Sequence, residues 1–231
     1  MRYNDIYEGV FIERPNRFIA RVELSGEEKV CHVKNTGRCR ELLSEGARVI
    51  LDRSPIRERK TEYDLIAVYK GDRLFNIDSQ APNKVFGEWL SRCDYFGDIT
   101  LIKPEVTYRN SRFDFYVETA ERKIFIEVKG VTLERDGVLL FPDAPTERGA
   151  KHLSELSEAV RDGYEAYVFF IIQTNICKYF TPNEQTDPLF AERLRTAAKK
   201  GVGVCALTCD VTPDSLTVND FVEVRLDFQS T

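Results

Sequence analysis

The sequence has few of the features that mark common metal, membrane and nucleotide sites. It contains two histidines, and its six cysteines form no Cys-x-x-Cys pair, so a zinc centre is not expected. No apolar run approaches the length of a membrane span, and the first residues form no apolar leader. A glycine-rich phosphate loop and a serine or cysteine nucleophile motif are also missing. We therefore expect a cytoplasmic protein with mostly reduced cysteines and no membrane partner.

An excess of positive charge is absent too. The 231 residues include 33 Lys+Arg against 38 Asp+Glu, which gives a formal net charge of -5 at pH 7. The chain is therefore no polycation, and any binding of nucleic acid must be local. Hydrophobic residues make up 42% of the sequence, which is ordinary for a globular protein of one large or two small domains.

The first eighty residues alternate short strand-like runs with turn residues, which is typical of a β-meander. The predicted elements are strands at residues 10–13, 17–24, 29–33, 48–51 and 63–69, a short helix at 38–43 and a further strand at 74–77. Three strands, a helix and two strands is the order of an OB-fold barrel, although other small five-stranded barrels give the same pattern. We predict an OB-fold nucleic-acid-binding domain over residues 1–80.

OB-folds often hold nucleic acid on a face that carries basic and aromatic residues. Strand alternation puts Arg17 and Arg21 on the same outer face, and Arg38 follows the turn at residues 35–37. Each is by itself more typical of a solvated surface, but together they indicate a local basic groove. The predicted contacts to nucleic acid in this domain are Arg17, Arg21, Asn35, Thr36 and Arg38.

A predicted hairpin over residues 112–130 carries the strongest candidate site. Alternation along its second strand separates the isoleucines and valine from Glu127 and Lys129. When the first strand pairs back antiparallel, Asp114 lies opposite or diagonal to Glu127. Two carboxylates beside a lysine are suited to a magnesium ion acting on a phosphate.

A Glu-x-Lys pair is also common on an ordinary solvated sheet face. The neighbouring residues here are Ile, Phe and Val, which indicates that the strand is buried on both faces, where charges need a partner or a metal. The favoured hypothesis is a phosphodiester site in which Asp114 and Glu127 hold Mg²⁺ or Mn²⁺ and Lys129 takes part in the chemistry.

A mixed α/β domain is predicted for residues 81–231. Its first helix, capped by Asn83, would bring Glu88 to the metal as a further carboxylate if it packs on the hairpin. The apolar run at residues 166–172 predicts a fully buried central strand. Gln173 follows at the strand end, where open α/β sheets keep their sites.

A second predicted helix, residues 148–160, gathers polar side chains on one flank: Arg148, Lys151, His152 and Glu155. Ion pairs on a solvent face are the simpler interpretation. The functional interpretation has Arg148 and Lys151 contact nucleic acid while His152 and Glu155 support the catalytic residues.

Four phrases resemble the sugar fermentation stimulation protein A family. They are Asn35-Thr36-Gly37 with Glu41-Leu42-Leu43, Arg112-Phe113-Asp114-Phe115, the run of residues 125–133, and the run of residues 141–156. The resemblance implies an N-terminal OB-fold joined to a domain similar to the PD-(D/E)XK nucleases, with DNA binding as the usual activity. The nuclease motif then falls on Asp114, Glu127 and Lys129.

The motif departs from the nuclease pattern at one position, because Phe113 stands where the pattern has proline. The pair Pro142-Asp143 lies after the Glu-x-Lys strand, in the wrong order to be the first element of the motif. Asp143 is therefore predicted only as a neighbour of the site.

Three functions follow from these patterns. The first is a DNA-binding nuclease dependent on Mg²⁺ or Mn²⁺, with DNA favoured over RNA. The second is a non-catalytic DNA-binding regulator, which the name of the family connects with sugar metabolism. The third is a sugar-binding or protein-interaction module, because OB-folds also take oligosaccharides.

Overall fold

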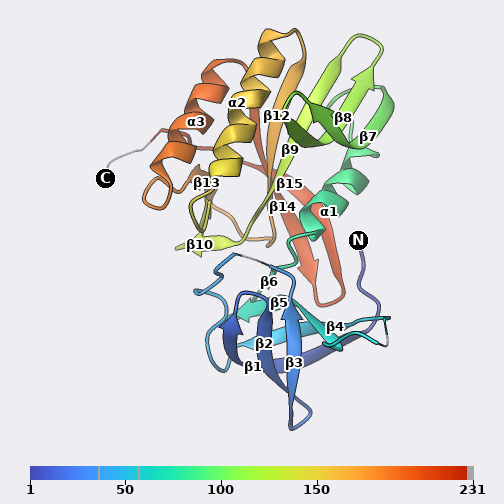
Figure 1. Ribbon diagram of the computed structural model, residues 1–231, viewed down its shortest axis with the longest axis vertical. Coiled ribbons are helices and arrows are strands. Elements are labelled where there is room, and N and C mark those ends of the chain that lie inside the picture. Colours follow the sequence, from blue (N-terminus) through green and yellow to red (C-terminus); the bar gives the residue numbers. More distant parts are fainter. Residues whose placement is uncertain (36, 57, 228–231) are drawn as a thin grey trace.

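The computed structural model describes residues 1–35, 37–56 and 58–227 (Figure 1). Thr36, one of the predicted nucleic-acid contacts, lies outside the described residues. No helix formed by the described residues combines the length and the apolar character that a membrane span requires.

The N-terminal part is a closed five-stranded barrel, as predicted. Its strands are β1 (Ile6–Asn16), β2 (Ile19–Leu24), β3 (Glu27–Val33), β4 (Arg48–Arg53) and β5 (Tyr63–Lys70), with β6 (Arg73–Asn76) added beside β5. The strand order is β3-β2-β1-β4-β5-β6, and a parallel pairing of β3 with β5 closes the barrel. Alternating side chains such as Ala20, Val22 and Leu24 fill its core.

The short helix predicted at residues 38–43 is wrong. This segment forms turns, in which the N–H groups of Leu42 and Leu43 both donate to the Cys39 carbonyl. Both leucines are buried in the barrel core. Burial of these side chains therefore holds the segment without a helix.

The C-terminal part is an α/β domain around a six-stranded sheet of order β15-β14-β12-β9-β8-β7. The strands are β7 (Ile99–Tyr108), β8 (Ser111–Thr119), β9 (Lys123–Val131), β12 (Glu165–Ile172), β14 (Gly203–Thr212) and β15 (Ser215–Val222). The central strands β9, β12 and β14 run parallel, and the outer pairings are antiparallel. A three-stranded sheet of β10 (Leu133–Arg135), β11 (Val138–Phe141) and β13 (Tyr179–Pro182) stands beside it.

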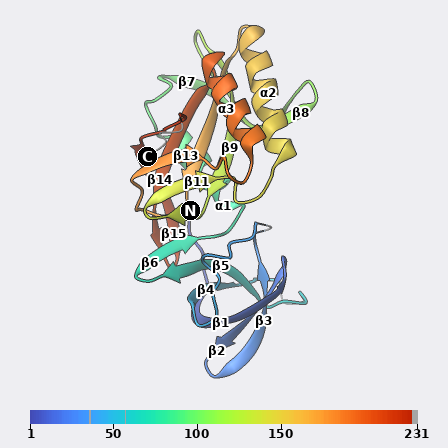
Figure 2. The same cartoon turned by 90° about the vertical axis from the view of Figure 1, so that its left-hand side faces the viewer.

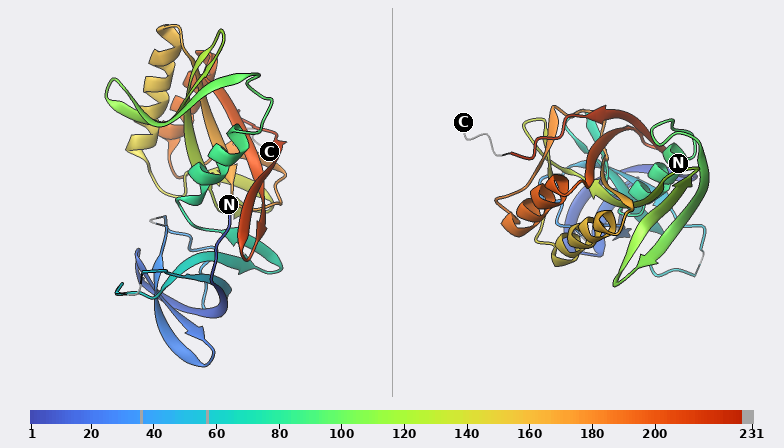
Figure 3. Two further views of the ribbon diagram at one scale, coloured as in Figure 1. Left: turned by 90° about the vertical axis from the view of Figure 1, so that its right-hand side faces the viewer. Right: turned by 90° about the horizontal axis from the view of Figure 1, so that it is seen from above.

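Helices cover both faces of the large sheet (Figure 3). They are α1 (Ala81–Leu90), α2 (Glu147–Arg161) and α3 (Pro188–Lys199). Val168 and Phe170 of β12 pack on the face covered by α2 and α3, whereas Phe169 packs on the face covered by α1. The run predicted as a central strand is therefore buried on both faces, which explains why it is apolar throughout.

Residues 222–227 alternate valine and leucine with charged side chains, a pattern that favours a half-exposed strand, but the last strand of the described residues lies closer to the N-terminus. Val222 ends β15, and among the described residues beyond it Val224 makes one isolated bridge with Phe180. The alternation of valine and leucine with charge arises here because the segment runs along the surface beside β13.

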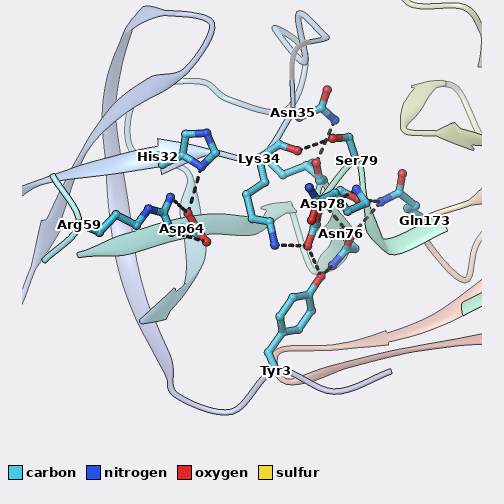
Figure 4. Close-up of polar contacts among 12 residues, drawn as sticks. Tyr3, His32, Lys34, Asn35, Arg59, Asp64, Asn76, Asp78, Ser79 and Gln173 are labelled. Atoms are coloured by element: carbon cyan, nitrogen blue, oxygen red, sulfur yellow. Dashed lines mark hydrogen bonds and ion pairs between the residues drawn. The ribbon is translucent and has the colours of Figure 1, made fainter. Parts of the chain in front are cut away.

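The barrel lies at one end of the α/β domain (Figure 2), and polar side chains connect the two domains (Figure 4). The barrel ends at Asn76 and α1 begins at Ala81, so the boundary predicted after residue 80 falls in this connection. Gln173, at the end of β12, donates from Nε2 to Asn76 Oδ1 (2.8 Å) and to the Asp78 carbonyl (3.1 Å). The buried Asp78 carboxylate also pairs with Lys34 at 2.8 Å. These bonds fix how the barrel sits on the sheet.

A second link between the domains is the pair of Lys70 on β5 and Glu134 on β10, at 2.5 Å with Glu134 only 5% exposed. Burial alone would raise the pKa of Glu134, but hydrogen bonds from Lys70 and the Gly137 N–H hold that pKa below its ordinary value of 4.5. The pair therefore stabilises the fold above pH 4.5, and this contribution is lost as the pH falls through the lowered pKa.

Replacing Lys70 by alanine is expected to lower the free energy of unfolding at pH 7 by about 1 to 2 kcal/mol, because Glu134 stays buried without its cation. The loss should shrink as the pH falls below 4.5, since protonated Glu134 gains little from Lys70. Urea unfolding across pH measures both effects. Lys29→Ala, which removes an exposed pair with Glu27, is the control, and an equal loss in both variants would contradict the prediction.

Candidate metal and nucleic-acid site

Asp114 lies where β8 and β9 separate. The two strands pair from Phe115 opposite Ile126 outward, and at the next position the Asp114 carboxylate takes the Val128 N–H at 2.7 Å. Its other oxygen accepts from Asn83 Nδ2 of α1, also at 2.7 Å. A carboxylate held at both oxygens has one orientation, and Asp114 lies close enough to Glu127 for the negative charge of Glu127 to raise the pKa of Asp114.

Glu127 on β9 is 3% exposed, and its two oxygens are used differently. Oε1 accepts from Lys129 Nζ at 2.5 Å and also bonds to His152 Nδ1. Oε2 is buried and has no hydrogen-bond partner among the described residues. A buried carboxylate oxygen without a donor is costly, so it marks the point where a cation would be most favourable.

His152 of α2 fixes the Glu127 side chain. Arg148 Nε donates to His152 Nε2 at 3.4 Å, so this ring nitrogen is the acceptor. Nδ1 then carries the proton and donates to Glu127. The helix that carries these residues starts at Thr146, whose Oγ1 accepts from the Gly149 N–H at 3.0 Å.

The two carboxyl groups have pKa values shifted in opposite directions. Burial, together with the negative charge of Glu127, raises the pKa of Asp114. Burial would also raise the pKa of Glu127, but the hydrogen bond from His152 and the charge of Lys129 bring it below its ordinary value. Such divergent shifts are typical of functional pairs. A divalent cation between the carboxylates would relieve the repulsion that raises the pKa of Asp114.

The donor set fits a hard divalent cation in an open site. Within the part of the chain that the structure describes, no group of three or more His, Cys, Asp and Glu gathers as a metal cage. Mg²⁺ commonly uses one or two protein carboxylates and completes its shell with water and substrate phosphate. Asp114 and the free Oε2 of Glu127 offer such a pair.

Glu88, predicted as a further metal carboxylate, is not brought to this pair. Its Oε2 accepts from the Met1 amino group at 2.7 Å, and its side chain is 48% exposed. Glu88 follows Asn83 by five residues, which turns it about 140° around α1 from the side chain that reaches Asp114. The prediction that Asn83 caps α1 is also wrong, because the N-cap is Gln80 and Asn83 lies in the first turn.

The polar side chains on the flank of α2 make contacts in two different places. His152 and Arg148 face Glu127, as described above. Lys151 instead donates to the Asn110 carbonyl at 2.8 Å and lies 3.7 Å from Glu155 Oε1. Glu155 has a second oxygen that is buried and unpaired among the described residues. Lys151 therefore reaches the β7–β8 turn, and Glu155 lies beside Lys151.

The barrel residues predicted to contact nucleic acid differ in how free their charges are. Arg17 is exposed and stacks on the exposed Phe18 ring, 4.9 Å from its centroid. Arg21 lies between two acidic side chains, 3.3 Å from Glu13 and 3.6 Å from Glu28. Arg17 thus presents a cation beside an aromatic ring, whereas Arg21 is paired with two carboxylates.

Asn35 and Arg38 shape the loop between β3 and β4. Asn35 donates from Nδ2 to the Ile77 carbonyl at 2.9 Å and accepts the Gly37 N–H at 2.7 Å. The Arg38 N–H donates to Asp143 Oδ2 at 2.8 Å, and its side chain is exposed. Asp143 is therefore a contact between the domains, as is Gln173.

Sequence reasoning missed Arg14, the residue that organises this loop. Its guanidinium donates to the carbonyls of Arg17, Asn35, Gly37 and Arg38 at 2.7, 2.6, 2.9 and 2.8 Å. No pattern around Arg14 in β1 distinguishes it from a surface arginine.

Asn83 was predicted as a helix cap only. Pro82, which favours the first helical turn, is the signal that could have placed Asn83 inside the helix.

A closed OB barrel followed by an α/β domain, with paired carboxylates and a lysine on adjacent strands, defines the class of this protein. Two family models match it: the SfsA N-terminal OB domain over residues 12–77, and the sugar fermentation stimulation protein RE domain over residues 80–215. The chain belongs to the sugar fermentation stimulation protein family.

Curated relatives match over the whole length. The sugar fermentation stimulation protein homolog of Desulfitobacterium hafniense (strain DSM 10664 / DCB-2) is 61% identical, over 98% of this chain and 99% of the relative. The homolog of Clostridium beijerinckii is 54% identical, over 98% and 100%. A solved structure, Pyrococcus furiosus SfsA in complex with Ca²⁺, matches with a TM-score of 0.87 and 27% identity, over 97% of this chain and 98% of that one.

Proposed function

We propose that this chain binds DNA and hydrolyses its phosphodiester bonds with Mg²⁺ or Mn²⁺ at Asp114, Glu127 and Lys129. The observation that carries the proposal is the unpaired, buried Oε2 of Glu127 beside a second carboxylate and a lysine. The Pyrococcus furiosus SfsA structure in complex with Ca²⁺ supports a preference for a hard, oxygen-binding cation.

Each residue has a defined task. A divalent cation, when bound, acts as a Lewis acid and lowers the pKa of water. Asn83 and the Val128 N–H orient Asp114, and His152 orients Glu127. Lys129 is 17% exposed, so its ammonium can contact both Glu127 and a phosphate from solvent. There it stabilises the negative charge that develops on the phosphate oxygens.

Exposed basic side chains on both domains would hold the strand. Arg17 with Phe18 and Arg38 extend from the barrel, and Arg148 is exposed on α2 next to His152. A stacking ring beside cations is the usual way in which OB-folds bind single strands. Because these are phosphate contacts, binding should weaken steeply as the salt concentration rises.

A cleavage assay tests the proposal. Labelled single-stranded DNA, double-stranded DNA and RNA are incubated with the protein in Mg²⁺, Mn²⁺ or chelator. We expect cleavage that needs the metal and falls by about 10²- to 10³-fold in Lys129→Ala. Lys123→Ala removes an exposed lysine at the start of the same strand and should cut at the rate of the unmodified protein. Metal-independent cutting, or equal loss in both variants, would contradict the mechanism.

A non-catalytic DNA-binding regulator is the second candidate. It is favoured by the observation that three of the four carboxylate oxygens of Asp114 and Glu127 already have protein donors. This function predicts that DNA is retained in chelator with a steep salt dependence and that no substrate is cut. A sugar-binding module would instead show almost no salt dependence.

A further inference from the structure

A cavity of about 300 Å³ lies between the barrel and the α/β domain. Asn35 and Gly37 line the barrel side, and Gly130, Asp143 and Gln173 lie on the other side. Figure 4 shows Asn35 and Gln173 on opposite sides of this joint. We propose that this cavity holds one unpaired nucleobase of the strand whose phosphate lies at Lys129. The inference rests on the proposed function and names its substrate as single-stranded or locally unpaired nucleic acid.

The lining of the cavity suits a neutral ring rather than a phosphate. Among the described residues that line it there is no lysine or arginine, and Asp143 contributes a carboxylate. An anion would therefore be repelled. Apolar residues also line the cavity, among them Leu133, Leu140 and Pro142, and a flat base can pack against apolar surface.

Two residues that line the cavity, Gln173 and Asp143, each have an oxygen that accepts no hydrogen bond from the described residues. Gln173 is 1% exposed, and its Nε2 is used on Asn76 and Asp78, yet its Oε1 accepts no hydrogen bond from the described residues. Asp143 Oδ2 takes the Arg38 N–H, and Oδ1 accepts none from the described residues. Amino and ring N–H groups at the edge of a base are the donors that such oxygens lack.

Glycine at position 130 keeps the Gln173 oxygen open. A Cβ there would lie 2.7 Å from Gln173 Oε1 and 2.7 Å from Pro82 Cγ. Gly130 directly follows Lys129 on β9. The backbone of Gly130 thus lines the cavity one residue, about 3.8 Å along the chain, from the Cα of Lys129.

The size of the cavity limits its occupant. A volume of about 300 Å³ is at the small end of ligand pockets and admits one base rather than a base pair. A base can enter only when it is unpaired or flipped out of a duplex. The cavity thus selects for substrates with single-stranded character.

Fluorescence of 2-aminopurine tests the proposal without any cleavage. The fluorescent base is placed at each position in turn of a single-stranded DNA of about 12 nucleotides, and the full-length protein is added in chelator. We expect a fluorescence change at one position that its neighbours do not show. An abasic site at that position should weaken binding by about 5- to 100-fold, as for loss of one stacked base.

Two tryptophan substitutions form a matched pair. Ala144→Trp fills the cavity and should remove the position-specific signal, whereas Ala120→Trp, in the exposed β8–β9 turn, should keep it. If Ala144→Trp does not fold, Asp143→Asn is used, since it retains an acceptor for Arg38 and should change which base is preferred.

The possible outcomes distinguish failure of the base pocket from failure of the proposed function. A strand that is bound with equal signals at all positions overturns the base pocket and leaves the proposed function standing. A strand that is not bound overturns both. If RNA of the same sequence gives the same fluorescence signal, the pocket binds the base without regard to the sugar, which supports the proposal. If free deoxyguanosine at matched concentration displaces the labelled strand, the cavity is a nucleoside site, and the proposal that it holds a base of a bound strand is overturned.

Discussion

Cleavage that depends on metal is expected to disappear in Asp114→Ala, with a loss of about 10³-fold or more in rate. Asp114 supplies one of the two carboxylates, and its orientation is fixed by Asn83 Nδ2 and the Val128 N–H. Without it, Glu127 Oε2 alone faces the cation. Calorimetric titration with Mg²⁺ or Mn²⁺ measures the loss of metal affinity. A cleavage assay on the same preparation measures the loss of rate.

The same substitution is expected to cost only modest stability. The Val128 N–H loses its acceptor, which destabilises the fold by about 1 to 3 kcal/mol. Part of this is offset because the repulsion between Asp114 and Glu127, which raises the pKa of Asp114, is removed. A variant that unfolds in mild urea would show that Asp114 is mainly structural, so the unfolding curve must be recorded with the assay.

Asn83→Ala is the matched control. It keeps the carboxylate and removes one of its hydrogen bonds, so the metal affinity should fall by only about 10- to 100-fold. In the metal-free protein the pKa of Asp114, already above its ordinary 3.8, should rise further in this variant, because the Asn83 bond lowers it. A pH titration of the carboxyl carbon by NMR measures the shift. Equal activity in Asn83→Ala and Asp114→Ala would contradict the assigned roles.

Local patterns were sufficient to predict the hairpin that carries the candidate site. Period-two alternation places Glu127 and Lys129 on one face, and antiparallel pairing brings Asp114 beside them. The neighbouring helix was also predicted with His152 on its flank. These inferences worked because each depends on residues close in sequence or on the two strands of a single hairpin.

Contacts between the domains could not be predicted in this way. Gln173 and Asp143 were predicted as supporting residues of the site. Their contacts with the barrel could not be foreseen, because the partners Asp78 and Arg38 are about a hundred residues away in sequence. Strand β7 was missed because it is a sheet edge, interrupted by Pro104 and with no buried residue along its length. Edge strands need not alternate apolar and polar residues.

Arg14→Ala is expected to loosen the loop that joins the barrel to the cavity. Its guanidinium binds four carbonyls, those of residues 17, 35, 37 and 38. Losing charged hydrogen bonds of this kind should lower the free energy of unfolding by about 2 to 4 kcal/mol, less than their simple sum. Arg14→Lys should recover little, because one ammonium cannot reach all four carbonyls. Urea unfolding measures the loss.

Arg21→Ala provides the comparison on the same barrel. Arg21 makes exposed ion pairs with Glu13 and Glu28, so its removal should cost no more than about 1 kcal/mol. The loop carries Asn35 and Gly37 of the cavity, and its Arg38 N–H holds Asp143. Arg14→Ala should therefore weaken binding of single-stranded DNA while the metal affinity of the Asp114–Glu127 pair stays unchanged. If Arg14→Ala lost both DNA binding and metal affinity, the loop would support the whole contact between the domains. If it lost neither, the loop would have no role in DNA binding.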